Sequence, residues 1–250
     1  MKFNRIHAVA LVLFAFTLHI GLVQAGEWKK RIMAYGDSNT FGWFFNATGA
    51  ADRYPLEIAW PGQLKTVLGD EYEVIVEGLG GRTSNVTPPI PFGSGDIPPV
   101  AFNGAEYIQP ALSSHMPLDL VIIMLGTNDL RVDLKRQADD IAKGVIELAT
   151  TVMQGKWQDK TNFVTPKVLI VSPTKLDVHS QYASIFVGSL PKTEALAGIL
   201  RPLAEGIGAH FFDAATVVPF PEGSDQIHLN PANHATLGKA LAVEVRKILK

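Results

Sequence analysis

The chain has no cysteine among its 250 residues. Disulfide bonds, thiol catalysis and a lipid-modified N-terminal cysteine are therefore excluded, and the hydrophobic core alone must hold the fold together. The chain also has no excess of positive charge, because 22 Lys and Arg residues face 24 Asp and Glu residues, for a formal net charge of -2 at pH 7. Without a basic field, nucleic acid is not an expected partner.

Long apolar runs are scarce, and the first of them lies at the N-terminus. Residues 8–23 are mostly apolar, but they are too short and too interrupted, by His19, for a good membrane span. Val23-Gln24-Ala25 then supplies small residues at the two positions that an export peptidase reads. We therefore expect residues 1–25 to be a signal peptide, with an uncleaved N-terminal anchor as the alternative. The mature protein would be exported, periplasmic or secreted, and no later segment approaches a membrane span.

What the chain does contain is typical of a globular protein, since 47% of its residues are apolar and 18% are charged. Short apolar runs alternate with longer patterns of helical period. We expect strands over 31–35, 73–77, 118–125, 167–171 and 210–212. We expect helices over 60–68, 134–153, 192–207 and 231–249. This alternation predicts an α/β fold in which helices cover both faces of a parallel sheet.

Two stretches, 87–104 and 172–191, fit neither a strand nor a helix. The first is rich in proline and glycine, and the second is irregular. Both follow predicted strands, so they start at the carboxyl edge of the sheet, where ligands bind in open α/β folds. Long loops in such a position often form lids or binding walls.

Polar residues directly follow two of the predicted strands. Gly36-Asp37-Ser38-Asn39 places a serine at the edge of the sheet, where its hydroxyl and its backbone N–H can both face a bound carbonyl. Gly126-Thr127-Asn128-Asp129 follows the most apolar strand, and the Asn128 amide can donate a hydrogen bond to a developing oxyanion. The alternative for each pattern is a polar turn or loop cap without catalytic use.

A third polar pattern, Asp225-Gln226-Ile227-His228, precedes the last predicted helix. A serine nucleophile needs a base to take its proton, and that base needs a carboxylate to fix its tautomer. A separation of three residues can place Asp225 and His228 side by side within one turn. The alternatives are a surface loop and half of a metal site. His234 lies nearby, but the chain has no His-x-x-x-His pair, so zinc is weakly supported.

The combination of these patterns resembles the SGNH hydrolases, also called the GDSL esterase/lipase family. The three patterns match the first, third and last blocks of that family, and Gly81 matches the glycine of its second block. Asn39 departs from the family, because most members have Leu at this position. The chain is most similar to the bacterial arylesterase/acyltransferase group, on the residues of 36–43, 77–85, 118–129, 167–173 and 211–214.

The resemblance implies a flavodoxin-like three-layer α/β/α fold with a central five-stranded parallel sheet, formed as one domain by residues 26–250. It also implies that Ser38 attacks the ester carbonyl, that His228 accepts its proton, and that Asp225 orients His228. The oxyanion would be held by the backbone N–H groups of Ser38 and Gly81 and by the Asn128 side chain. Gly81 suits this role because a residue without a Cβ atom lets its N–H approach a ligand closely.

Residues close to the nucleophile are candidates for the substrate pocket, namely Asn39, Trp43 and Phe44. For the aromatic residues, and for the adjacent Phe45, ordinary core packing is the alternative. Arg82, beside the second-block glycine, is either a surface charge or a brace for that loop.

These observations predict a serine esterase that hydrolyses short-chain acyl and aryl esters, with acyl transfer to alcohols as a secondary activity. The main alternative is a carbohydrate O-acetylesterase that acts on acetylated polysaccharides, and outside enzymes it is a binding module that has lost catalysis. An ordinary α/β-hydrolase is disfavoured, because Gly-x-Ser-x-Gly is absent. The expected partner is a small-molecule ester, no metal or organic cofactor is implied, and the resemblance suggests a higher-order homo-oligomer.

Overall fold

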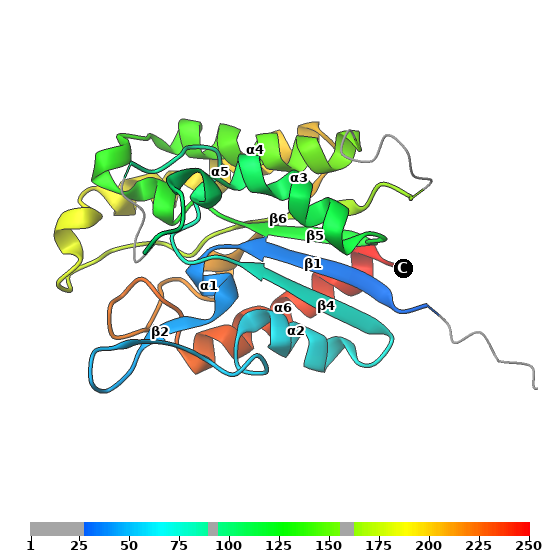
Figure 1. Ribbon diagram of the computed structural model, residues 1–250, viewed down its shortest axis with the longest axis horizontal. Helices are drawn as coiled ribbons and strands as arrows, with labels where there is room; N and C mark the ends of the chain where they lie inside the picture. The colour runs from blue at the N-terminus through cyan, green and yellow to red at the C-terminus, as the bar shows by residue number, and fades with distance from the viewer. Residues whose placement is uncertain (1–27, 90–94, 156–162) are drawn as a thin grey trace, which may run out of the picture.

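The structure of the protein is a computed structural model that describes residues 28–89, 95–155 and 163–250 (Figure 1). The predicted signal peptide, residues 1–25, lies outside the described residues. Helices cover both faces of one central sheet, so the molecule has three layers. Within the part of the chain that is described, no helix has both the length and the hydropathy needed to cross a membrane.

All five predicted strands are present in the central sheet, and they pair in parallel. Their order across the sheet is β4-β1-β5-β6-β7, which is the flavodoxin-like order and confirms the predicted α/β/α fold. The order reverses between β1 and β5, and ligands bind in such sheets at the carboxyl ends of the strands that flank this point. The strands are β1 (Lys30–Gly36), β4 (Tyr72–Gly78), β5 (Leu120–Met124), β6 (Lys167–Ser172) and β7 (His210–Asp213).

The core has two layers, one on each face of the sheet, and the side chains of β1 alternate between them. Ile32 and Ala34 join one layer, while Met33 and Tyr35 join the other, because successive side chains of a strand alternate between its faces. The first layer is covered by helices α2 (Trp60–Leu68) and α6 (Pro231–Ile248). The second layer is covered by helices α3 (Gly104–His115), α4 (Ala138–Gln154) and α5 (Ser189–Gly206), on the opposite side of the sheet in Figure 1.

The four predicted helices are confirmed as α2, α4, α5 and α6, with differences at two of their starts. α4 begins at Ala138 rather than at residue 134, because Lys135 has a φ of 53° that interrupts the helical backbone. α5 begins at Ser189 rather than at residue 192. The short elements are α1 (Ser38–Phe41) and the 3-10 turns η1 (Pro99–Phe102), η2 (Asn128–Leu130), η3 (Val132–Leu134), η4 (Ala183–Ile185) and η5 (Ala214–Thr216).

Two features were not expected from the sequence. Helix α3 contains Pro110, which weakens a helical pattern, but the Asn103 side chain caps its start and Ile108 and Leu112 are fully buried on one face. The second feature is an antiparallel hairpin formed by β2 (Trp43–Phe45) and β3 (Ala51–Arg53), which follows α1.

Candidate active site

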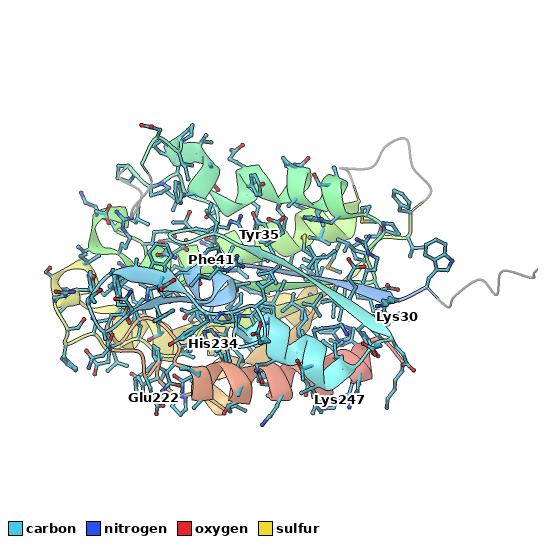
Figure 2. The ribbon with its side chains drawn as sticks, turned by 60° about the horizontal axis from the view of Figure 1, so that its bottom comes forward. Lys30, Tyr35, Phe41, Glu222, His234 and Lys247 are labelled. Carbon is cyan, nitrogen blue, oxygen red and sulfur yellow. The ribbon has the colours of Figure 1, made fainter. Side chains whose placement is uncertain are left out.

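The site lies at the carboxyl ends of the parallel strands. Figure 2 shows Lys30, the start of β1, at one end of the sheet and Phe41, just beyond its end, toward the other. Ser38 is the first residue of α1, and Asp37 caps this helix by accepting a hydrogen bond from the Asn39 amide. Gly42, with a φ of 86°, ends the helix after a single turn. The strand, turn and helix together hold the serine at the sheet edge.

Ser38, His228 and Asp225 form a continuous hydrogen-bonded line. Ser38 Oγ lies 2.9 Å from His228 Nε2, although 190 positions separate the two residues in the chain. His228 Nδ1 contacts Asp225 Oδ2 in a short hydrogen bond. The other carboxylate oxygen of Asp225 accepts hydrogen bonds from the amides of Ile227 and His228, each at 3.0 Å. The carboxylate is therefore fixed on both of its oxygens, and the imidazole stands between it and the serine.

The protonation of Asp225 suits this arrangement. Burial raises the pKa of its carboxyl, but the hydrogen bonds and charge of His228, together with the Ile227 amide, outweigh burial and leave the pKa below its ordinary value. Asp225 is therefore ionised at neutral pH and can stabilise a positive charge on His228. A hydroxyl, an imidazole and a carboxylate in this order can transfer a proton away from the hydroxyl as it attacks an electrophile.

Gly81 and Asn128 border the same cavity as Ser38. Gly81 has a φ of 82°, a backbone conformation that favours glycine, so its amide orientation depends on the absence of a side chain. The Asn128 side chain is fixed by a hydrogen bond of 3.1 Å that its Nδ2 donates to the Arg82 carbonyl. Neither the Ser38 amide nor the Gly81 amide donates a hydrogen bond to another described residue, so both donors are available to a ligand.

Arg82 braces the loop that carries Gly81. Its side chain is buried, with 2% of the residue exposed, which excludes the surface-charge interpretation. The guanidinium donates hydrogen bonds to the carbonyls of Gly36 and Glu77, at the ends of β1 and β4, and stacks 4.2 Å from the centre of the Tyr35 ring. It thereby connects the second-block loop to the strand that precedes the serine.

A second polar cluster, formed by Asp129, Arg136 and Ser84, was not predicted from the sequence. Asp129 Oδ1 accepts hydrogen bonds from Arg136 and from the Ser84 hydroxyl, at 2.7 Å and 2.6 Å. Asp129 Oδ2 accepts one from the Ser84 amide at 2.9 Å. All three residues are buried. Because Asp129 follows Asn128 and Ser84 follows the Gly81–Arg82 turn, this cluster connects two loops that border the cavity.

The cavity itself has a volume of about 380 Å³ and opens in front of Ser38 and His228. The two long loops contribute to its wall, with Ile97 from the first and Tyr182 and Phe186 from the second. No lysine or arginine is found among the described residues that line it. The lining residues are Ser38, Phe41, Trp43, Phe45, Leu79, Gly80, Gly81, Ile97, Phe102, Asn128, Tyr182, Phe186, Asp225, Ile227 and His228.

Two of the residues predicted to line the pocket lie elsewhere. Phe44 points away from the cavity and stacks on Tyr54, with 4.1 Å between ring centres, because side chains alternate along β2 and Trp43 and Phe45 take the cavity side. Asn39 is buried and hydrogen-bonds the loop that carries His228. Trp43 does line the cavity, and its indole stacks against His228 with 6.4 Å between ring centres.

The described residues contain no candidate metal site, because no three His, Cys, Asp or Glu side chains are grouped to hold an ion. His234, the candidate for half of a metal site, is fully buried and accepts a hydrogen bond from the Trp60 amide at 3.2 Å. Burial, and to a lesser extent the charge of His228, lowers its pKa to about 3. His234 is thus a neutral core residue that connects α6 to the start of α2.

Comparison with known proteins agrees with this geometry. The family model described as the GDSL-like Lipase/Acylhydrolase family matches residues 34–236. The chain is similar to the aryl esterase of M. smegmatis, with 41% identity over 88% of this chain and 99% of that chain and a TM-score of 0.80. It is also similar to a carbohydrate acetylesterase from Sinorhizobium meliloti, with 35% identity over 88% of this chain and all of that chain and a TM-score of 0.80. No curated protein gives a significant match.

Proposed function

The chain belongs to the GDSL-like lipase/acylhydrolase family and is a carboxylic ester hydrolase, and on this premise we propose that Ser38, His228 and Asp225 are its catalytic triad. The observation that carries the proposal is the contact of 2.9 Å between Ser38 Oγ and His228 Nε2. In this mechanism His228 takes the serine proton as Ser38 attacks the ester carbonyl, and returns it to the leaving alcohol. Water then hydrolyses the acyl-enzyme by the same route, and Asp225 stabilises the imidazolium in both steps.

In this proposal, three hydrogen-bond donors stabilise the negative charge that develops on the carbonyl oxygen. They are the amides of Ser38 and Gly81 and the Nδ2 group of Asn128, all of which border the cavity. The two amides have no other partner among the described residues, and Asn128 is already oriented by the Arg82 carbonyl. Donors that are fixed before the substrate arrives need no reorganisation during the reaction, and losing one typically costs about 10²–10³ in rate.

For the substrate, we propose short-chain acyl esters and aryl esters. The cavity has an apolar, aromatic wall that includes Trp43, Phe45 and Phe102, and its volume of about 380 Å³ fits a small ester. The similarity to the M. smegmatis aryl esterase supports this choice. The similarity to the S. meliloti carbohydrate acetylesterase favours a second candidate, removal of acetyl groups from carbohydrates. The wall offers few polar groups to bind sugar hydroxyls, so we place the aryl and alkyl esters first.

The direct test compares esters of p-nitrophenol and acetylated glycans as substrates of the purified protein. We expect faster hydrolysis of the acetate than of long-chain homologues, and slower release of acetate from glycans. A rate that rises with chain length would exclude the small-acyl proposal, and a preference for glycans would establish the second candidate. Vinyl acetate with an added alcohol tests acyl transfer, since formation of free acid alone would exclude it.

The triad is tested by Ser38→Ala and His228→Ala, each of which should lower kcat by several orders of magnitude. Ser114→Ala is the matched control, because the Ser114 hydroxyl lies on the exposed side of α3 and, among the described residues, bonds only the Pro110 carbonyl. A serine-reactive organophosphonate should label the parent protein and the control but not Ser38→Ala. Labelling of Ser38→Ala, or full activity in His228→Ala, would refute the proposed triad.

Export and assembly belong to the same proposal. We propose that residues 1–25 direct export to the periplasm or the medium, so that N-terminal sequencing of the exported protein should start at Gly26. We also propose a higher-order homo-oligomer, which light scattering on the purified protein would detect as a mass several times that of one chain. A protein that keeps its N-terminus, or a monomer at working concentration, would refute the respective statement.

A further inference from the structure

Asn39 connects the nucleophile turn to the loop that carries His228. It follows Ser38 directly in α1 and is buried, with 5% of the residue exposed. Its Nδ2 donates a hydrogen bond to the Ile227 carbonyl at 3.2 Å, and its Oδ1 accepts one from the Leu229 amide at 2.9 Å. These two backbone groups stand on either side of His228, so one side-chain amide holds the main chain both before and after the imidazole.

The two backbone groups depend on Asn39 alone within the described chain. No other described residue hydrogen-bonds the Ile227 carbonyl or the Leu229 amide, and both residues are buried. The orientation of the side-chain amide is also determined by its partners, because exchanging its oxygen and nitrogen would set donor against donor and acceptor against acceptor.

The backbone of Asn39 is itself held in place within the turn that carries Ser38. Its backbone amide donates to Asp37 Oδ1 at 2.9 Å, so the residue is part of the capped turn that presents Ser38. The loop of His228 has a separate anchor at Asp225, whose Oδ1 accepts from the Ile227 and His228 amides. Asp225 sets the local shape of that loop, whereas Asn39 sets where the loop lies relative to the serine.

We propose that Asn39 is a positioning residue, which keeps the His228 imidazole at hydrogen-bonding distance from Ser38 by clamping the main chain on both sides of it. The inference rests on the proposed function, in which His228 is the general base. A base must lie within hydrogen-bond reach of the proton that it abstracts, and a displacement of about 1 Å can cost on the order of 10²-fold in rate. Loss of the clamp leaves a buried donor and a buried acceptor unpaired, and the loop moves to satisfy them.

The test replaces Asn39 by Leu, which has a similar volume but no hydrogen-bonding group. We expect Asn39→Leu to lower kcat for p-nitrophenyl acetate by about 10- to 100-fold, because the base is displaced. We expect KM to change less than about twofold, because Asn39 does not line the cavity. The fraction of molecules titrated by an organophosphonate at long times separates slow chemistry from a loss of folded protein.

Thr40→Val is the matched control, since it also alters a buried polar residue of α1. The Thr40 hydroxyl has no hydrogen-bond partner among the described residues, so its removal should leave kcat and KM unchanged. If Asn39→Leu does not fold, Asn39→Ala removes the same two hydrogen bonds with less crowding and should give the same division between kcat and KM.

The possible outcomes distinguish the inference from the proposed function. A lower melting temperature with an unchanged kcat would show a purely structural role and overturn the inference. A raised KM with an unchanged kcat would place Asn39 in the substrate wall and overturn it as well. If Asn39→Leu matches the parent protein while His228→Ala is inactive, the inference alone fails. If His228→Ala retains full activity, the proposed function fails, and the positioning role fails with it.

Discussion

Two polar clusters lie in neighbouring loops at the same edge of the sheet, and both are built around a carboxylate. In the Ser38–His228–Asp225 line the carboxylate holds an imidazole, and all three residues border the cavity. In the Asp129–Arg136–Ser84 cluster the carboxylate holds a guanidinium, and none of the three residues borders the cavity. The clusters share hydrogen bonding and burial but differ in the partner of the carboxylate and in access.

The difference bears on which cluster can transfer a proton and which can only support the fold. An imidazole changes its protonation near neutral pH and can therefore carry a proton between a serine and a leaving group. A guanidinium stays protonated under all such conditions, so Arg136 cannot carry a proton to or from Asp129 and instead fixes the geometry of its neighbours. Asp129 follows Asn128 directly, and its partner Ser84 lies three positions after Gly81. The cluster therefore connects the two loops that carry proposed oxyanion donors.

Three further substitutions test this comparison, and the largest effect among them is expected from Asp225→Asn, which keeps the shape of the line but removes its charge. The amide can still accept from the Ile227 and His228 amides, so the loop should keep its fold. The imidazole loses the carboxylate that orients it and stabilises its cation, and we expect kcat to fall by about 10⁴-fold at pH 7.5. Steady-state kinetics with p-nitrophenyl acetate, together with thermal melting, measure the two effects separately. A loss of less than about tenfold would place Asp225 outside the triad.

Next in size is Asp129→Ala, which should act on stability. Removal of the carboxylate leaves the Arg136 guanidinium buried without its partner, and breaking a buried ion pair in this way typically costs about 3–5 kcal/mol. Urea unfolding should show this loss in the free energy of unfolding. Asp70→Ala is the control, because Asp70 pairs with Lys65 at 3.3 Å on the exposed surface and its loss should change little. Equal effects of the two substitutions would contradict the assignment of a structural role to the buried cluster.

The sequence predicts the strands and the local polar patterns better than the long-range contacts between loops. The strands are recognised because their apolar runs are local, and the three polar patterns are recognised because each occupies four consecutive residues. The Asp129 cluster is missed because its partner Ser84 lies 45 positions away, and no local pattern connects them. Helix α3 is missed because Pro110 argues against it, whereas burial of Ile108 and Leu112 outweighs the proline.

Side-chain direction explains the errors at the pocket. Asn39 follows Ser38 in sequence, which suggests that both residues face the cavity. Successive residues of a helix differ in direction by about 100°, so Asn39 faces the His228 loop while Ser38 faces the cavity. Phe44 is misplaced for the equivalent reason in a strand, where neighbours point to opposite sides. Both errors were open to correction from periodicity, but only after α1 and β2 had been recognised as a helix and a strand.

Asp37 carries a third buried carboxyl, and the charges of both His228 and Asp129 act on it. Its carboxyl is buried, with 1% of the residue exposed. Burial raises its pKa to about 6, against the smaller lowering effects of the Asn39 amide and of the charge on His228, while the charge of Asp129 adds to the increase. Asp37 has no cation in direct contact in the described chain, so its ionised form costs stability in the folded state. Burial also raises the pKa of Asp129, although the Arg136 guanidinium acts against this increase.

The smallest of the three effects is therefore expected from Asp37→Asn, and it should depend on pH. The folded-state pKa of about 6 lies above the ordinary value of 3.8, so ionisation destabilises the folded protein above pH 6 and has no such effect below pH 4. The Asn side chain can keep the cap by accepting from the Asn39 amide without carrying a charge. The free energy of unfolding of Asp37→Asn, minus that of the parent protein, should therefore rise by about 2–3 kcal/mol between pH 4 and pH 7. Urea titrations at pH 4, 5, 6 and 7 measure this difference, and a constant value across the range would mean that the folded protein compensates the Asp37 charge.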